Sequence, residues 1–216
     1  NMTIRLASGG YIGGGLYHSQ NIEGALATMP GARIVYPCFA DDAAGLLRTA
    51  MRSKGITVFM EPKALYNSPQ ASASIPDDFE VPFGKARIRK EGADLTLITY
   101  GNTLIHSLEA ADKLEVEGID VEVIDLRSLV PLDKETILNS IKKTNKAMVV
   151  HEDKVFAGFG SEITSTIMEE AFEYLDGPVK RVGSTFTPVG FNRILEKAVL
   201  PNTDKIIEAA KELLKY

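Results

Sequence analysis

Patterns typical of strands and of helices alternate along this chain in two stretches, and this alternation constrains the fold more than any other feature. In the first stretch, a β-branched run at 33–36 is followed by apolar residues at helical spacing over 41–53 and by a second apolar run at 57–61. Two strands joined by such a helix pair in parallel, because a parallel pair needs a crossover connection. The first stretch therefore predicts a βαβ unit in a parallel sheet.

The second stretch repeats the alternation with more elements. Gly118 is a candidate C-cap for its first helix, and Asp133 is a candidate N-cap for its second. The expected strands are 95–99, 121–124, 147–150 and 179–182, and the expected helices are 102–117, 133–143, 160–174 and 203–215. Antiparallel sandwiches and helix bundles do not have this order. The chain is therefore predicted to have an α/β fold with a mainly parallel sheet.

A polar segment rich in proline and serine separates the two stretches and has no sustained periodicity. It predicts a linker, or a segment that lies over the surface of the protein. The predicted organisation is a first part over 1–66, a linker over 67–81 and a compact second domain over 82–216.

Composition excludes several classes of protein. Lys and Arg number 24 against 29 Asp and Glu, so no large cationic face remains for a phosphate backbone, and nucleic acid is not an expected partner. The longest apolar runs are strand-sized, far below the ~20 residues of a membrane span, so no membrane span is expected. A single Cys and three His exclude an internal disulfide and a structural zinc site, and they favour a reducing, cytosolic compartment.

The glycine-rich stretch 9–15 (Gly-Gly-Tyr-Ile-Gly-Gly-Gly) matches neither common phosphate loop. A Walker loop needs Lys and then Ser or Thr after its last glycine, but Leu16 and Tyr17 stand there. In a dinucleotide fingerprint starting at Gly13, the third glycine falls at His18. The stretch therefore predicts a loop whose backbone can approach a ligand or another subunit closely.

A histidine and several hydrogen-bonding side chains follow this loop, in the run 16–21. His18 in such a place can exchange a proton near neutral pH. The alternative is a capping cluster, in which Ser19 or Asn21 caps a helix at 22–28. The residues alone favour the capping interpretation.

The other chemically reactive residues are interpreted as structural. Cys38 precedes a helix, but Asp41 and Asp42 place negative charge beside it and disfavour the thiolate. His106 lies inside a helical pattern without a partner in sequence. The run 151–153 (His-Glu-Asp) ends a strand, where a turn with a helix cap is favoured over a role in function or assembly.

Motifs in order along the whole chain resemble the β subunit of the thiamine-diphosphate-dependent 2-oxo acid dehydrogenases, the E1 component. Three features favour the branched-chain (2-oxoisovalerate) enzymes: Glu61-Pro62-Lys63, the pair Leu16-Tyr17 and the terminal Tyr216. The matching motifs are Tyr17-His18-Ser19-Gln20, the run 30–37, Asp42–Leu47, Val81–Ala86, Asp125-Leu126-Arg127, Pro131-Leu132-Asp133, His151-Glu152 and Gly158–Ile163.

The resemblance implies an architecture. Residues 1–66 would be the later part of a pyrimidine-binding domain, and 82–216 a transketolase C-terminal-type domain. Thiamine diphosphate with Mg2+ would lie between this β portion and an E1 α portion, which is separate or fused. Because Asn1 precedes Met2, we expect the chain to be cut from a longer protein, without the cofactor-activating glutamate and the diphosphate-binding motif. The isolated chain is then expected to bind no cofactor and to be inactive.

The resemblance also implies site residues. His18 matches the active-site histidine that serves proton transfer as the acyl group moves to the lipoyl group of E2, and Tyr17, Ser19 and Gln20 are candidate cofactor neighbours. Some related enzymes hold a monovalent cation at a site between the first strand and the turn after the helix at 41–53. In this sequence the side-chain ligands of that site are replaced, so mainly carbonyl oxygens would remain as ligands. The corresponding positions are Met2, Thr3, Ala50, Ser53 and Gly55.

The implied partners are the E1 α portion, the subunit-binding and lipoyl domains of E2, and a second copy of the chain paired through the C-terminal domain. Asp176 and the carboxylate of Tyr216 match the places that dock E2. The compartment would be the bacterial cytoplasm, or the mitochondrial matrix in a eukaryote.

Other functions remain open at this level. The chain could be a pyruvate or acetoin dehydrogenase E1 β portion, or a non-catalytic module for dimerisation and E2 docking. A transketolase or a 1-deoxyxylulose-5-phosphate synthase is disfavoured by the contexts of Glu61-Pro62-Lys63 and Tyr17-His18-Ser19-Gln20.

Overall fold

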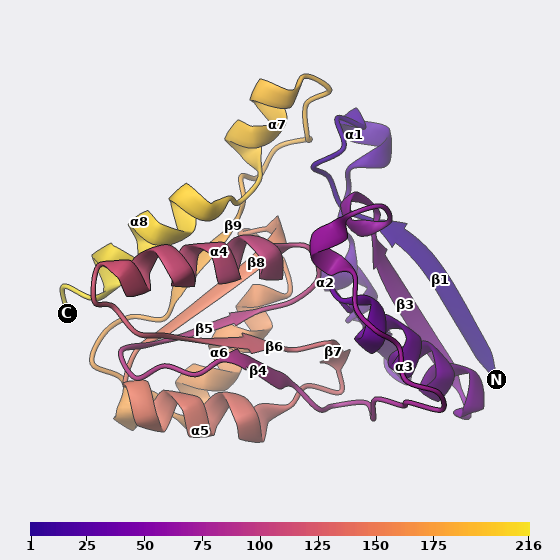
Figure 1. Cartoon of the computed structure of the whole chain (residues 1–216), viewed down its shortest axis with the longest axis horizontal. Coiled ribbons are helices and arrows are strands. Elements are labelled where there is room, and N and C mark those ends of the chain that lie inside the picture. Colours follow the sequence, from indigo (N-terminus) through magenta and orange to yellow (C-terminus); the bar gives the residue numbers. More distant parts are fainter.

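The computed structural model describes residues 1–216 and contains two β-sheets that lie side by side (Figure 1). The first has four strands in the order β1-β3-β2-β7, and the second has five in the order β4-β6-β5-β8-β9. The α/β fold with mainly parallel sheets is as the sequence predicts. None of the helices is both long and apolar enough to cross a membrane.

The first sheet is built around the predicted βαβ unit. Strand β2 (Ala32–Val35) leads through helix α3 (Ala40–Arg52) to β3 (Ile56–Pro62), and the two strands are parallel. Strand β1 (Met2–Ser8) pairs in parallel with the other side of β3 and forms the outer edge. The fourth strand, β7 (Ser128–Val130), comes from the second stretch of the sequence and pairs antiparallel with β2.

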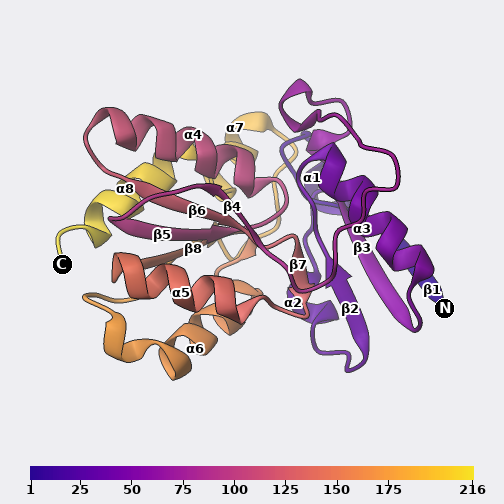
Figure 2. The same cartoon turned by 60° about the horizontal axis from the view of Figure 1, so that its bottom comes forward.

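The second sheet has helices on both faces (Figure 2). Its strands are β4 (Arg87–Lys90), β5 (Leu95–Thr99), β6 (Val121–Asp125), β8 (Ala147–Lys154) and β9 (Lys180–Ser184). Helices α4 (Thr103–Val116) and α8 (Thr203–Leu213) cover one face, and α5 (Lys134–Thr144) and α6 (Gly160–Glu170) cover the other. Successive residues of β5 alternate between the two cores, since Leu97 packs with α4 and α8 whereas Ile98 packs with α5 and α6.

Most predicted elements of the second stretch are confirmed, including both helix caps. The Asp133 carboxylate accepts a hydrogen bond from the Thr136 N–H at 3.2 Å, and Gly118 adopts φ of +83° directly after Glu117, the C-cap residue of α4. The helix expected over 160–174 is wrong at its end, because α6 stops at Glu170 and a 3-10 turn follows. Strands β4 and β7 and helix α7 (Arg193–Val199) were not predicted.

The proline-rich segment lies over α3 and contains only 3-10 turns. Arg48 of α3 donates hydrogen bonds to the carbonyls of Pro76 and Phe79, at 3.1 and 3.0 Å. Val81 is buried against the same helix and would lie 2.7 Å from a Cβ placed on Gly45. The segment is therefore packed surface chain, and the boundaries at 66 and 82 stay a prediction.

Candidate functional site

The glycine-rich loop connects β1 to the short helix α1 (Gly15–His18), and its backbone N–H groups bind carboxylates of the second sheet and of α7. The N–H of Gly10 donates to Glu152 of β8. The N–H groups of Ile12 and Gly13 donate to Glu196 of α7, at 3.2 and 3.1 Å. The close approach predicted from the glycines is thus an approach to this chain's own carboxylates.

Glycine is needed here for space and for backbone conformation. A Cβ placed on Gly10 would lie 2.8 Å from a methyl group of Leu200 and 3.2 Å from Glu196 Oε1. Gly9 has φ of +85°, and a Cβ on it would lie 2.9 Å from both Glu152 carboxylate oxygens. Any larger residue at these two positions would push the loop away from the carboxylates.

Tyr11 anchors the loop further by pointing into the second domain. Its hydroxyl donates to the carbonyl of Pro201 at 2.7 Å, and its ring centroid lies 5.0 Å from that of His106. Burial raises the pKa of Tyr11 well above its ordinary range and lowers the pKa of His106. His106 therefore contributes to packing, as the sequence predicts.

His18 is the last residue of α1, and its side chain is exposed. Its carbonyl accepts a hydrogen bond from Lys63 Nζ, and no hydrogen bond engages its imidazole. Tyr17 beside it is 87% exposed. Both side chains are free to meet another molecule.

The two residues after His18 are turned inward. Ser19 is buried, and its hydroxyl has no hydrogen-bond partner. Gln20 donates to the Leu16 carbonyl at 3.0 Å and accepts from Lys154 Nζ at 2.9 Å. The predicted set therefore divides into two exposed residues, Tyr17 and His18, a buried Ser19 and a Gln20 whose side chain bridges two parts of the chain.

The capping interpretation of this segment is wrong. Helix α2 (Glu23–Leu26) has Ile22 at its N-cap, and no side chain caps it. Asn21 instead accepts hydrogen bonds from the hydroxyls of Ser8 and Tyr36, both at 2.9 Å. These tertiary partners take the side chain away from its own helix.

The run His151, Glu152 and Asp153 is also not a turn with a helix cap, because all three lie within β8 and are buried. Neither ring nitrogen of His151 has a hydrogen-bond partner, and burial lowers its pKa to about 4. Burial raises the pKa of Glu152 and of Asp153. Strand β8 lies inside the sheet, and of these three residues Glu152 contacts the glycine loop.

Glu23 of α2 completes this buried polar region between the two sheets. It accepts a hydrogen bond from the Tyr100 hydroxyl at 3.0 Å, and burial raises its pKa to about 8, with the Asp153 charge adding to the effect. No basic side chain lies within ion-pair distance of Glu23, Glu152 or Glu196. Hydrogen-bond donors therefore decide how these carboxyl groups are accommodated.

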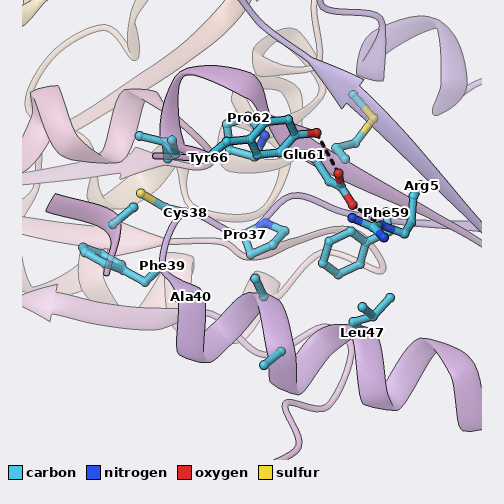
Figure 3. Close-up of a pocket in the computed structure, with 15 residues that line it drawn as sticks. Arg5, Pro37, Cys38, Phe39, Ala40, Leu47, Phe59, Glu61, Pro62 and Tyr66 are labelled. Atoms are coloured by element: carbon cyan, nitrogen blue, oxygen red, sulfur yellow. Dashed lines mark hydrogen bonds and ion pairs between the residues drawn. The ribbon is translucent and has the colours of Figure 1, made fainter. Parts of the chain in front are cut away.

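A separate cavity of about 260 Å3 lies beside α3 at the end of β3, and sequence reasoning missed it (Figure 3). Its wall is mainly apolar. At its rim Arg5 forms an ion pair with Glu61, which also accepts a hydrogen bond from the Tyr66 hydroxyl at 2.7 Å. The sequence feature that could have indicated this cavity is the pair Arg5 and Glu61, two charged residues in otherwise apolar strand patterns.

This cavity offers no reactive group. Cys38 lines it, and burial raises the pKa of the thiol, which therefore stays protonated, as its structural interpretation predicts. The Arg5 and Glu61 side chains neutralise each other. His18 is not among the lining residues, so the cavity accommodates an apolar group and does not include the predicted catalytic histidine.

The groups of the predicted monovalent-cation site are engaged in hydrogen bonds within the chain. The Gly55 carbonyl accepts from the Met2 N–H at 2.9 Å, and the Ser53 hydroxyl donates to the Thr49 carbonyl at 2.7 Å, so these groups already have partners. No cluster of three or more His, Cys, Asp and Glu residues has the arrangement of a metal site. Cation binding at Met2, Thr3, Ala50, Ser53 and Gly55 stays a prediction.

Asp176 and Tyr216 lie close together at the C-terminal end of the molecule. A Cβ placed on Gly177 would be 3.0 Å from Tyr216 Cβ, and Asp176 lies 3.7 Å from Lys146 Nζ. The Tyr216 side chain is exposed. The structure brings the two predicted docking residues together, and E2 docking itself stays a prediction.

Models of known protein families match both halves of the chain. The family model of the transketolase C-terminal domain matches residues 84–206, and that of the transketolase pyrimidine binding domain matches 1–69. A pyruvate dehydrogenase E1 component subunit beta from Rickettsia felis is 41% identical over 92% of this chain and 60% of its own length. A 2-oxoisovalerate dehydrogenase subunit beta from Bacillus subtilis is 38% identical over 100% of this chain and 66% of its own.

A solved structure supports the fold. A split-gene transketolase, described as an inactive β4 tetramer, superimposes with a TM-score of 0.76 and 24% identity, over 99% of this chain and 65% of that one. The chain thus spans about 60% of the length of the first curated relative and similar shares of the others named.

Proposed function

The chain belongs to the transketolase C-terminal domain family, and from this premise we propose that it is part of the E1 β portion of a thiamine-dependent 2-oxo acid dehydrogenase. The relatives named as E1 β subunits of such enzymes support the proposal. The observation that carries the proposal is the exposed imidazole of His18, which has no hydrogen-bond partner in this chain and lies two residues before the anchored Gln20.

In this proposal His18 moves a proton at one of its imidazole nitrogens as the acyl group passes to the lipoyl group of E2. Its ring is exposed, so an incoming lipoyl arm can reach it. Tyr17 beside it is the second side chain of this chain that can contact the cofactor or the substrate, whereas Ser19 is buried and Gln20 bonds to the backbone of Leu16.

Thiamine diphosphate, when bound, supplies the nucleophilic carbon and the electron sink for decarboxylation. The residues here fit its reactive end better than its diphosphate. Three N–H groups of the glycine loop already bind Glu152 and Glu196, so these donors are not free to bind a phosphate. We therefore assign the diphosphate and Mg2+ to the E1 α portion, and His18 with Tyr17 to the side of the cofactor that faces this chain.

For the substrate we propose a branched-chain 2-oxo acid, because of Glu61-Pro62-Lys63, the pair Leu16-Tyr17 and the terminal Tyr216. Pyruvate is the second candidate, since relatives named as pyruvate dehydrogenase subunits reach 41% identity. Turnover of the assembled enzyme with 2-oxoisovalerate and with pyruvate decides between them by the ratio of kcat/KM.

The proposed partners are the E1 α portion, a second copy of the chain, and E2 through Asp176 and the Tyr216 carboxylate. These two lie together on an exposed surface, which supports a common docking point. The proposed compartment is the bacterial cytoplasm or the mitochondrial matrix.

The test is His18→Ala in E1 assembled with its α portion. Lipoyl acylation should slow by roughly 10²–10⁴-fold, as for the loss of an acid–base group, with little change in substrate KM. Val116→Ala serves as a control, because Val116 is 89% exposed at the end of α4. An unchanged acylation rate in His18→Ala would contradict the proposal, as would decarboxylation by the isolated chain supplied with thiamine diphosphate and Mg2+.

A further inference from the structure

The segment that carries His18 is a closed loop. The N–H of Gly9 donates to the carbonyl of Gln20 at 3.1 Å, which joins the two ends of the segment. Between them lie a glycine run and a helix of four residues, α1, too short to hold its own conformation. Contacts from outside the loop must therefore set where His18 stands.

Lys63 donates to the carbonyl of His18 itself, and three side chains of the second domain contact the two arms of the loop. On the arm before His18, Glu196 binds the N–H groups of Ile12 and Gly13, and Glu152 binds that of Gly10. On the arm after it, Lys154 Nζ donates to Gln20 Oε1 at 2.9 Å. Figure 1 shows the result, with α1 beside α7 although they are far apart in sequence.

Glu196 is the contact closest to the flexible part of the loop. It is buried, no basic side chain pairs with it, and the loop N–H groups are the donors that satisfy its carboxylate. Beyond it the chain continues as Gly13, Gly14 and Gly15, which have the largest backbone freedom. Because one side chain accepts from two successive N–H groups, it fixes the start of this run at two points.

We propose that Glu196 is a positioning residue for His18, and that the second domain thereby sets the active-site loop as well as serving assembly. The catalytic consequence rests on the function proposed above, whereas the restraint on the loop does not. Glu196 acts through the backbone of Ile12 and Gly13 and touches no reacting atom. Glu152 and Lys154 support the same loop from β8.

The first test measures amide hydrogen exchange in the 216-residue chain. In Glu196→Ala, exchange at Ile12 and Gly13 should speed up at least about 10-fold, because the acceptor of both N–H groups is gone. Glu196→Gln keeps an amide oxygen as acceptor and should restore part of the protection. Unchanged protection in Glu196→Ala would overturn the proposal.

The matched control is Glu122→Ala. Glu122 is also a buried glutamate, but it lies in β6 and pairs with Lys143, away from the loop. Its loss should destabilise the domain without selective exposure of the loop. If Ile12 and Gly13 exchange no faster in Glu196→Ala than in Glu122→Ala, the effect is general unfolding and the proposal is wrong.

The second test uses E1 assembled with its α portion. Glu196→Ala should lower the rate of lipoyl acylation at least 10-fold with substrate KM nearly unchanged, and Glu196→Gln should recover part of the rate. If His18→Ala has no effect on acylation, the proposed function fails while the exchange result stands by itself. A loop released in Glu196→Ala together with full acylation would instead overturn the positioning role.

Discussion

The two sheets of this molecule reach their stability by different routes. Strands β5 and β6 are buried along their whole length, between helices on both faces. In β1, by contrast, only Ser8 is buried, and the strand forms an outer edge. The second sheet packs on its two faces in cores of 17 and 16 buried residues, whereas the core between α3 and the first sheet has four.

The difference shows that the first sheet depends on the second. One hydrophobic core contains side chains of both sheets, among them Ile34 and Met60 from the first and Ile98 and Tyr100 from the second. Strand β7 belongs to the second stretch of the chain but pairs with β2 of the first sheet. The loop that carries His18 is held in the same way, by Glu152 and Glu196. Local stability should therefore fall from the second sheet toward β1.

The largest expected effect comes from breaking the buried ion pairs between the two regions. Asp42 of α3 is fully buried and pairs with Arg127, at 2.7 Å, and with Arg89, which also binds Asp125. Asp42→Ala leaves both guanidinium groups short of a partner and should lower the free energy of unfolding by about 3–5 kcal/mol. Urea unfolding measures the loss.

The neighbouring Asp41→Ala is the control, since Asp41 contacts only the exposed Arg87 at 3.4 Å. It should cost less than about 1 kcal/mol. Equal losses in the two variants would show that the buried pairs do not join the regions.

A second prediction compares the same substitution in each sheet. Ile98→Ala, in the middle of β5, removes a fully buried side chain and should cost about 2–5 kcal/mol. Ile4→Ala, in β1, removes one that is 41% exposed and should cost under about 1 kcal/mol. Similar midpoints of chemical denaturation for the two variants would contradict the contrast between the sheets.

The third prediction concerns pH and the buried carboxyl group between the sheets. Unfolded Glu23 ionises near its ordinary pKa of 4.5, but burial keeps the folded group protonated until about pH 8. The folded state thus binds the extra proton in this window, and its stability falls as pH rises from 4.5 to 8. Against Glu23→Gln, the wild type should lose up to about 1.4 kcal/mol per pH unit.

Measurement between pH 6.5 and 8 avoids the contribution of His151, which changes the free energy of unfolding with pH in the opposite sense to Glu23. The folded pKa of His151, about 4, lies below its ordinary 6.5, so its contribution is lost as pH falls from 6.5 toward 4. A constant stability difference between wild type and Glu23→Gln across pH 6.5–8 would show that Glu23 is ionised in the folded protein.

The smallest expected effect is at the exposed end of the loop. Tyr17 makes no buried contact, since 87% of it is exposed, and Tyr17→Ala should change the free energy of unfolding by no more than about 0.5 kcal/mol. Thermal melting of the variant checks this. A larger loss would mean that α1 is packed more tightly than its exposure implies, and the loop would then belong with the stable region.

Periodicity determined most of the elements, because one period describes a helix and another a strand whatever surrounds them. The βαβ unit of the first stretch, the principal strands and helices of the second and the cap at Asp133 all follow from residues near one another in sequence. The same locality explains the misses. Strand β7 has three residues and exists because β2 lies beside it, and α7 begins in a segment without clear spacing.

At the candidate site, the sequence by itself determined that a glycine loop precedes His18 and that neither common phosphate motif is present. Only the tertiary structure decided what the glycines are for. Their N–H groups meet Glu152 and Glu196, which lie 142 residues beyond Gly10 and 183 beyond Gly13. No local pattern encodes such a pairing, because the carboxyl end of β8 and helix α7 are brought to the loop by the tertiary structure alone. A buried carboxylate then takes the donors that tertiary packing brings to it.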